Sequence, residues 1–311
     1  MCGIIAAASE RNVGKLLVQG LHKMEYRGYD SAGIALHQDD KIAHLRTLGK
    51  VKLLEEKMIS EKPRSKLGIA HTRWATHGEP SEENAHPHKS NERVYIVHNG
   101  IIENYLDLKD FLKKEGYSFS SQTDSELIAH MLEYFLSKDN TMLDAMYLTK
   151  EKLDGAYAIA AIDKENDKNI IIARSKSPLL IGIGIDEFLA ASDPLAIGQL
   201  TNEFIFLEDG DVAEISSQSY NIYDESKNKV DREITNIDIS SQATSKGEYK
   251  HFMEKEIYEQ PEAILNTIDG RVGGDDVLDN IFGLGSSDMF EKVKRIQIVA
   301  CGTSLHAGRV A

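Results

Sequence analysis

Cysteine is scarce in this chain of 311 residues, which contains only Cys2 and Cys301. Two thiols so far apart in sequence do not indicate a disulfide framework, and their scarcity is typical of a reducing cytoplasm. We expect Cys301 to be a small buried side chain. The chain also lacks an apolar run long enough for a transmembrane helix. Its first apolar run ends at Ala8 without a basic leader, so we expect no signal peptide, no membrane partner and a cytoplasmic location.

Positive charge is the second shortage. Lysine and arginine number 36 against 50 aspartates and glutamates, which gives a formal net charge of -14. This balance argues against nucleic acid as a partner, because a phosphate backbone attracts basic surfaces. The acidic residues are spread along the chain, which indicates a solvated, self-repelling surface. The length suits two domains of ordinary size.

Strands and helices are grouped along the chain rather than strictly alternating, which favours an α+β fold with mainly antiparallel sheets. Apolar patterning predicts a first helix with Asn12 as its candidate N-cap. The predicted helices span residues 13–24, 106–115, 125–136 and 142–153. The predicted strands span residues 2–8, 32–37, 42–48, 67–72, 93–98, 156–162, 169–174, 179–185, 204–207, 211–215 and 220–223.

A change of composition predicts a second domain. Residues 224–249 are polar and indicate either a linker or a loosely docked edge segment. Residues 251–268 look helical, although Pro261 should bend or restart that helix. A strand over residues 295–300 then runs into a short loop that should precede a helix. Because a parallel-sheet domain needs several more such units, we expect one domain over residues 1–240 and an incomplete one over residues 241–311.

The second residue carries the strongest chemical signal. Removal of Met1 would leave Cys2 with both a thiol and a free α-amine. A cysteine thiol titrates near ~8.5 and an α-amine near ~7.7 to 8.0, so the amine can accept the thiol proton at neutral pH. The alternative is that Cys2 is an inert small residue at the start of a strand.

Two later segments place polar groups at the ends of predicted strands. Arg73 could form a bidentate pair with a carboxylate, and the adjacent Trp74 lies among polar residues, where an aromatic lid competes with a core position. Asn99 and Gly100 combine a side-chain amide with a flexible backbone N–H. These are the two parts of an oxyanion hole.

Two further segments allow a structural or a functional reading. Residues 123–126 open a helix, so Thr123 or Asp124 could simply cap it or could bind a ligand. Residues 25–33 form a glycine-rich turn that contains Arg27 and could be an ordinary polar loop.

Taken together, residues 1–4, 26–33, 71–80, 84–88, 98–104 and 256–261 resemble the N-terminal-nucleophile glutamine amidotransferases, and among them the isomerizing glutamine:fructose-6-phosphate aminotransferases. Phosphoribosyl-pyrophosphate amidotransferases and asparagine synthetases share the N-terminal cysteine and an Arg-Gly turn, but the full patterns over residues 27–33 and 72–78 point away from them. The resemblance covers the whole chain. It implies a class II amidotransferase with a four-layer αββα sandwich, followed by a linker and the truncated start of an α/β sugar-isomerase (SIS) domain.

The resemblance also implies roles for individual residues in the hydrolysis of L-glutamine to glutamate and ammonia. Cys2 is the expected nucleophile, and Asn99 and Gly100 are expected to hold the oxyanion. The expected glutamine-binding residues, with Arg27 as possible support, are Arg73 for the α-carboxylate, Asp124 for the α-ammonium, Thr76 and His77 as pocket lining, and Trp74 as a shield that gates ammonia release.

Metal and cofactor sites are not expected. His71, His77, His86, His88 and His98 lie close in sequence and raise the question of zinc. Their spacing matches no recognised ligand pattern, so we expect structural hydrogen bonding instead.

The end of the chain resembles the first sugar-phosphate loop of the isomerase half, with Gly302, Thr303 and Ser304 at the phosphate. Complete family members bind fructose 6-phosphate there, aminate it to glucosamine 6-phosphate, and are expected to be homodimers. We expect this chain to hydrolyse glutamine without making the amino sugar. The alternatives are an amide hydrolase of the same fold with another substrate and a non-catalytic binding module.

Overall fold

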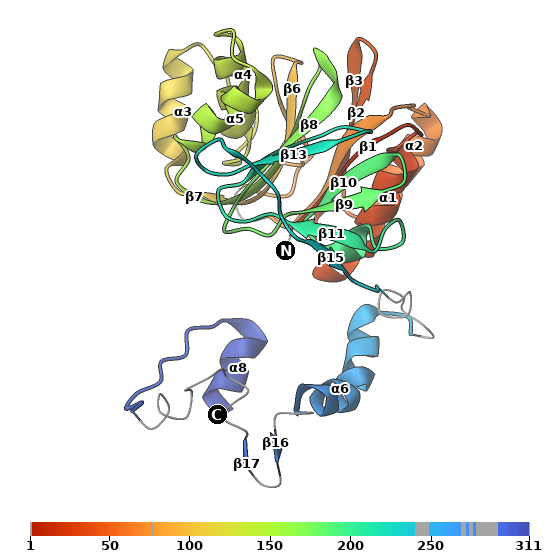
Figure 1. The fold of residues 1–311 in the computed structure, drawn as a ribbon, viewed down its shortest axis with the longest axis vertical. Coiled ribbons are helices and arrows are strands. Elements are labelled where there is room, and N and C mark those ends of the chain that lie inside the picture. Colours follow the sequence, from red (N-terminus) through yellow and green to blue (C-terminus); the bar gives the residue numbers. More distant parts are fainter. Residues whose placement is uncertain are drawn as a thin grey trace. The chain divides into compact units, whose positions relative to one another are not determined.

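The computed structural model describes residues 2–75, 78–239, 249–268, 272–273, 276–277 and 292–310. The chain divides into two units, Met1–Ser245 and Lys246–Ala311. Figure 1 shows their helices and strands.

The first unit contains two antiparallel sheets. The eight-stranded sheet has the order β15-β11-β9-β10-β1-β4-β2-β3, and the seven-stranded sheet has the order β14-β13-β12-β8-β7-β6-β5. The strands of the first sheet are β1 (Gly3–Ser9), β2 (Ser31–Gln38), β3 (Lys41–Leu48), β4 (Leu67–Arg73), β9 (Leu180–Gly184), β10 (Glu187–Ala191), β11 (Glu203–Phe206) and β15 (Ile234–Asn236). Those of the second are β5 (His88–Ser90), β6 (Val94–Ile102), β7 (Gly155–Asp163), β8 (Asn166–Ser175), β12 (Val212–Ile215), β13 (Tyr220–Tyr223) and β14 (Lys229–Val230).

Helices cover the outer face of each sheet. Helices α1 (Gly14–Lys23) and α2 (Val51–Glu61) pack on the first sheet, and α4 (Glu126–Leu136) and α5 (Met142–Lys150) pack on the second, with α3 (Tyr105–Lys114) against α4. Two short 3₁₀ helices, η1 (Glu25–Arg27) and η2 (Pro194–Ala196), complete the unit. The result is a four-layer αββα sandwich, which confirms the predicted fold class.

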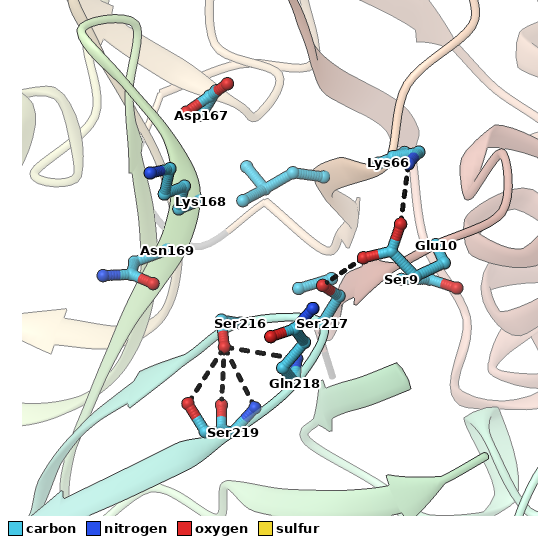
Figure 2. Close-up of a pocket in the computed structure, with 12 residues that line it drawn as sticks. Ser9, Glu10, Lys66, Asp167, Lys168, Asn169, Ser216, Ser217, Gln218 and Ser219 are labelled. Carbon is cyan, nitrogen blue, oxygen red and sulfur yellow. Dashed lines mark hydrogen bonds and ion pairs between the residues drawn. The ribbon is translucent and has the colours of Figure 1, made fainter. Parts of the chain in front are cut away.

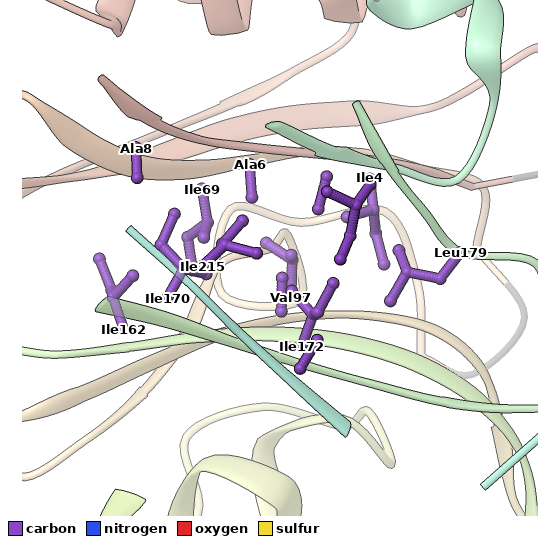
Figure 3. Close-up of a cluster of buried hydrophobic side chains, with 14 of the residues drawn as sticks. Ile4, Ala6, Ala8, Ile69, Val97, Ile162, Ile170, Ile172, Leu179 and Ile215 are labelled. Carbon is purple, nitrogen blue, oxygen red and sulfur yellow. The ribbon is translucent and has the colours of Figure 1, made fainter. Parts of the chain in front are cut away.

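The central strand β1 shows why its sequence is apolar at every position. Ile4, Ala6 and Ala8 point into the core between the two sheets, which Figure 3 shows, whereas Ile5 and Ala7 join the core beneath α1 and α2. Because both faces of β1 are buried, alternation is lost and a continuous apolar run results. The buried strand therefore holds the adjacent backbone of Cys2 in place.

Several predicted elements need correction. The strand predicted over residues 179–185 is confirmed as β9, but it is the first strand of a β9–β10 hairpin whose second strand we missed; Ile185 lies in the turn and is 93% exposed. Helix α2 was also missed, because only Val51 and Leu54 are buried and its apolar pattern is weak. The N-cap of α1 is Val13 rather than Asn12, although the Asn12 side chain accepts a hydrogen bond from the Gly14 N–H.

The polar segment after residue 224 is partly ordered against the sheets. Strand β14 pairs with β13, and β15 pairs with β11, so that β14 and β15 each form an edge of their sheet. The described part of this segment therefore agrees with the docked-edge alternative rather than with a free linker.

The second unit contains helix α6 (Phe252–Ile268), the short strands β16 (Val272–Gly273) and β17 (Asp276–Val277), and helix α8 (Gly302–Val310). Helix α6 continues through Pro261, so it does not restart there. The predicted strand over residues 295–300 is wrong: these residues form neither strand nor helix, and none of the described residues pairs with them. Cys301 is exposed rather than buried, because this segment packs against too few side chains to cover it.

Candidate active site

The antiparallel pairing of β1 and β4 brings Cys2 beside the loop that follows Arg73. Gly3 at the start of β1 is paired with Thr72 near the end of β4. The Trp74 backbone N–H donates a hydrogen bond to the Cys2 Sγ at 3.3 Å, and the thiol lies 3.6 Å from the Trp74 carbonyl. Burial raises the pKa of the Cys2 thiol, and this N–H and the Arg73 charge oppose the shift. The thiol therefore needs a proton acceptor to react at neutral pH.

Strand β6 brings a side-chain amide from the other sheet to the same place. The Asn99 Nδ2 donates to the Cys2 carbonyl oxygen at 3.2 Å. The next residue, Gly100, has a φ of 139°, and a Cβ there would lie 1.9 Å from the Ala156 carbonyl oxygen. Only glycine fits this position, so no side chain at residue 100 covers the backbone that follows Asn99.

These groups line one cavity of about 410 Å³. Seven of the predicted site residues are among its lining side chains: Cys2, Arg27, Arg73, Trp74, Asn99, Gly100 and Asp124. Thr76 and His77 lie outside the described residues. The cavity combines a thiol, an amide, a fixed cation and a fixed anion.

The cation is Arg73, which is only 3% exposed. Its guanidinium donates to the carbonyl oxygens of Gly78 at 3.2 Å and Glu79 at 3.5 Å, and lies 3.7 Å from the Asp30 carboxylate. Asp30 in turn accepts from the Ala75 N–H. The loop that carries Trp74 is thus held around this guanidinium, which gives the charge a fixed place.

The anion is Asp124, which is also 3% exposed. Its Oδ2 accepts from the Ile102 N–H at 2.8 Å, so it ties the end of β6 to the turn before α4. The capping alternative is wrong for both candidates: Ser125 is the N-cap, without a side-chain capping bond, and Thr123 bonds to His88 instead. The anion is therefore held at the cavity by the sheet, not used to start the helix.

Trp74 lies in a loop and is 53% exposed, so it is not a core residue. Its ring packs on Gly28, where a Cβ would approach the ring to 2.4 Å. Gly28 also has a φ of 74°, which L side chains rarely adopt. The glycine-rich turn after η1 therefore supports the aromatic side chain.

Arg27 is anchored at the cavity by an acidic partner. Its Nη2 lies 2.6 Å from the Asp193 Oδ2, which also accepts from the Tyr26 hydroxyl at 2.5 Å. This cluster joins η1 to the residue before η2.

Four buried histidines lie at the cavity, where His86 and His98 are among the lining residues, and three of the four form side-chain hydrogen bonds. His71 bonds to Asn99, His88 to Thr123 and His98 to Ser125. The expectation of hydrogen bonding is wrong for the His86 ring, whose nitrogens have no such partner; it packs on His71 and His88 instead. Within the described ranges, no group of three side chains is arranged to hold a metal ion.

Sequence reasoning missed part of the cavity wall. Ser177 and Pro178, between β8 and β9, line it more than 50 positions after the other lining segments, and no local pattern marks them. Ile101, next to Gly100, also lines the cavity and was missed.

A second cavity, of about 470 Å³, lies at the other end of β1 (Figure 2). Glu10 in this cavity pairs with Lys66 at 2.7 Å and accepts from Ser217. No cysteine is among its lining residues as described, so it offers no thiol.

The predicted sugar-phosphate residues Gly302, Thr303 and Ser304 are the first residues of α8 in the second unit. A helix after this loop was expected, and that expectation is confirmed. Their contact with a phosphate stays a prediction.

Comparison with known proteins finds similarity to glutamine amidotransferases. A glutamine amidotransferase domain model matches residues 71–199. The glutamine–fructose-6-phosphate aminotransferase of Haemophilus influenzae is 50% identical over 313 residues, which is 100% of this chain and 51% of the relative. That of Pseudomonas putida is 48% identical, with the same coverage. The chain thus spans about half the length of the curated relatives it matches.

Among solved structures, the glutamine phosphoribosylpyrophosphate amidotransferase from B. subtilis, complexed with ADP and GMP, superposes with a TM-score of 0.64 at 25% identity. The match covers 73% of this chain and 50% of that one. No helix among the residues that the structure describes is long and apolar enough to cross a membrane.

Proposed function

Because this chain belongs to the glutamine amidotransferase family, we propose that it hydrolyses L-glutamine to glutamate and ammonia with Cys2 as the nucleophile. The observation that carries the proposal is the single cavity in which Cys2, Asn99, Arg73 and Asp124 meet. A free amino acid carries one cationic and one anionic end, and Asp124 and Arg73 offer each end a charge of the opposite sign.

The reaction begins with a proton transfer. Once Met1 is removed, the α-amine of Cys2 takes the thiol proton, directly or through a water. The raised pKa of the buried thiol makes such an acceptor necessary. The thiolate then forms a bond to the side-chain amide carbon of glutamine, and the carbonyl electron pair moves onto the oxygen.

The tetrahedral intermediate is stabilised by hydrogen-bond donors. Asn99 Nδ2 and the backbone N–H of Gly100 hold the oxyanion in this mechanism. The intermediate collapses with loss of ammonia, which takes up the proton from the amine. Water then cleaves the thioester, which releases glutamate and regenerates the thiol.

The remaining residues recognise the substrate. Arg73 pairs with the α-carboxylate and Asp124 with the α-ammonium, while Thr76 and His77 line the same pocket and Arg27 supports it. Trp74 shields the reacting carbon and gates the release of ammonia.

The relatives suggest a wider role for the complete protein. Residues 1–240 would form the glutaminase domain, and residues 241–311 the linker and the start of a sugar-isomerase domain. There Gly302, Thr303 and Ser304 would bind the phosphate of fructose 6-phosphate, which accepts the ammonia to give glucosamine 6-phosphate. Such a protein would be a cytoplasmic homodimer that needs no metal or cofactor.

The test is a glutaminase assay with a matched pair of cysteine variants. Wild-type protein and Cys301→Ala should release glutamate at equal rates, whereas Cys2→Ala should release none while keeping its thermal unfolding midpoint. Hydrolysis by Cys2→Ala near the wild-type rate would place the nucleophile elsewhere. Hydrolysis of other primary amides in preference to glutamine would favour a general amide hydrolase, and no activity with Met1 absent would favour a binding module.

A further inference from the structure

A buried imidazole lies directly behind the Asn99 amide. The His71 Nε2 is 2.9 Å from the Asn99 Oδ1, and the His71 residue is fully buried in β4. It does not line the cavity, so it cannot contact a substrate there.

The direction of this hydrogen bond follows from the other end of the amide. Asn99 Nδ2 donates to the Cys2 carbonyl oxygen, and only the NH₂ group of the amide can do so. The Oδ1 must therefore face His71, and it can only accept. The His71 Nε2 consequently carries the proton.

The surroundings fix the ring in this place. His71 is paired with Ile4 of β1 on one side and with Gly33 of β2 on the other. Its ring packs on that of His86, with centroids 4.1 Å apart. Burial lowers the pKa of His71 to about 3, so the imidazole stays neutral at the pH of the cell.

We propose that His71 is a positioning residue, which holds the Asn99 amide through its Nε2–H so that Nδ2 faces the cysteine and the developing oxyanion. Without this donor, the amide can rotate by half a turn. Its oxygen would then face the Cys2 carbonyl and the oxyanion, where two acceptors repel. The inference rests on the proposed role of Asn99 and adds the group that keeps the Asn99 Nδ2 directed at the oxyanion.

A pair of substitutions separates hydrogen bonding from packing. In His71→Gln the amide nitrogen can take the place of Nε2, whereas His71→Met fills similar volume without a donor. We expect His71→Met to lower kcat for glutamine by about 10- to 100-fold, part of the loss typical for one oxyanion donor, with KM within about twofold. His71→Gln should keep kcat within about threefold of wild type.

The matched control is His37→Met, which removes another buried histidine of the same sheet that bonds to the Lys164 carbonyl. It should leave kcat unchanged. Alkylation of Cys2 by iodoacetamide, which needs no oxyanion hole, should proceed at equal rates in all variants. Equal loss of kcat in both His71 variants would overturn the inference in favour of packing alone, and so would full activity of His71→Met.

A measurement on the wild-type protein covers the case in which the variants do not fold. Long-range ¹H–¹⁵N correlation spectra should show the Nε2–H tautomer of His71, and the Nδ1–H tautomer would overturn the inference. Failure of the proposed function itself looks different, because wild-type protein would then release no glutamate.

Discussion

The two ends of the cavity are built differently. At the reaction end, Cys2 directly precedes the central strand β1 and Asn99 lies within β6, and they contact each other through the Cys2 backbone. At the recognition end, Arg73 ends β4 and contacts two loop carbonyls and the Asp30 carboxylate, whereas Asp124 lies in the turn before α4 and accepts from one strand N–H. The reaction end thus holds a thiol and an amide, and the recognition end holds two opposite charges. We expect substitutions at the first end to act on kcat and those at the second to act mainly on KM.

The largest effect is expected at the reaction end. Asn99→Ala removes a donor that acts mainly in the transition state, so kcat should fall by about 10² to 10³ with little change in KM. Steady-state glutaminase kinetics measure both. Asn104→Ala, which removes a nearby amide that bonds to the Lys152 carbonyl, is the control and should behave as wild type. A rise in KM alone would assign Asn99 to substrate binding.

The recognition end should show the opposite pattern. Arg73→Ala and Asp124→Asn each remove a charge-assisted contact with an unchanging end of glutamine, which costs roughly 1.5 to 3 kcal/mol. Because such contacts bind substrate and transition state alike, KM should rise by about 10- to 150-fold and kcat should fall less.

The exposed Asp107→Asn serves as a charge control for that pair. A pure kcat defect in Asp124→Asn would remove the distinction between the two ends.

Buried histidines make the first unit sensitive to acid. Burial lowers the pKa of His71 to about 3 and that of His44 to about 4, against about 6.5 in the unfolded chain. Below pH 6.5 the unfolded state therefore binds protons that the folded state does not. Below pH 6.5, each such histidine lowers the free energy of unfolding by up to about 1.4 kcal/mol for every unit by which the pH falls. Above pH 6.5 this loss is absent.

Urea denaturation at pH 7 and pH 5 measures this slope. His44→Gln keeps a donor for the Pro87 carbonyl but removes one titrating group, so the loss of stability between the two pH values should shrink by about 2 kcal/mol. His22→Gln is the control with the opposite sign, because Glu25 raises the pKa of His22. An unchanged slope in His44→Gln would mean that its burial is relieved in solution.

The smallest effect should come from the support beneath Trp74. Gly28→Ala places a methyl group against the indole and adds strain at a positive φ, so the ring must shift. We expect a severalfold change in KM with nearly unchanged kcat, and a change in tryptophan fluorescence, which reports on Trp74 alone because it is the only tryptophan. Identical fluorescence and kinetics would show that the turn does not support the ring.

The sequence predicts the residues that line the cavity better than the side chains that hold those residues in place. The layers were predictable because strands such as β1 are apolar on both faces. The site was predictable because Cys2 and Asp124 stand just before an element, Arg73 ends one, and Asn99 directly follows the strand predicted over residues 93–98. Helix α2 was not, since its amphipathic pattern is weak. Neither was the stack of His71 on His86, because it depends on a side-by-side packing that no spacing encodes. The strand expected over residues 295–300 failed because a strand needs a neighbour to accept its backbone hydrogen bonds.

The central claim is that Cys2 is the nucleophile of a glutamine-reading cavity, and covalent labelling tests it most directly. The protein would be incubated with a glutamine-mimicking diazoketone, and its intact mass and peptide masses measured with and without competing glutamine. The account predicts loss of Met1 and one label, on Cys2, that glutamine prevents. A label on Cys301, or no label with Met1 absent, would contradict it.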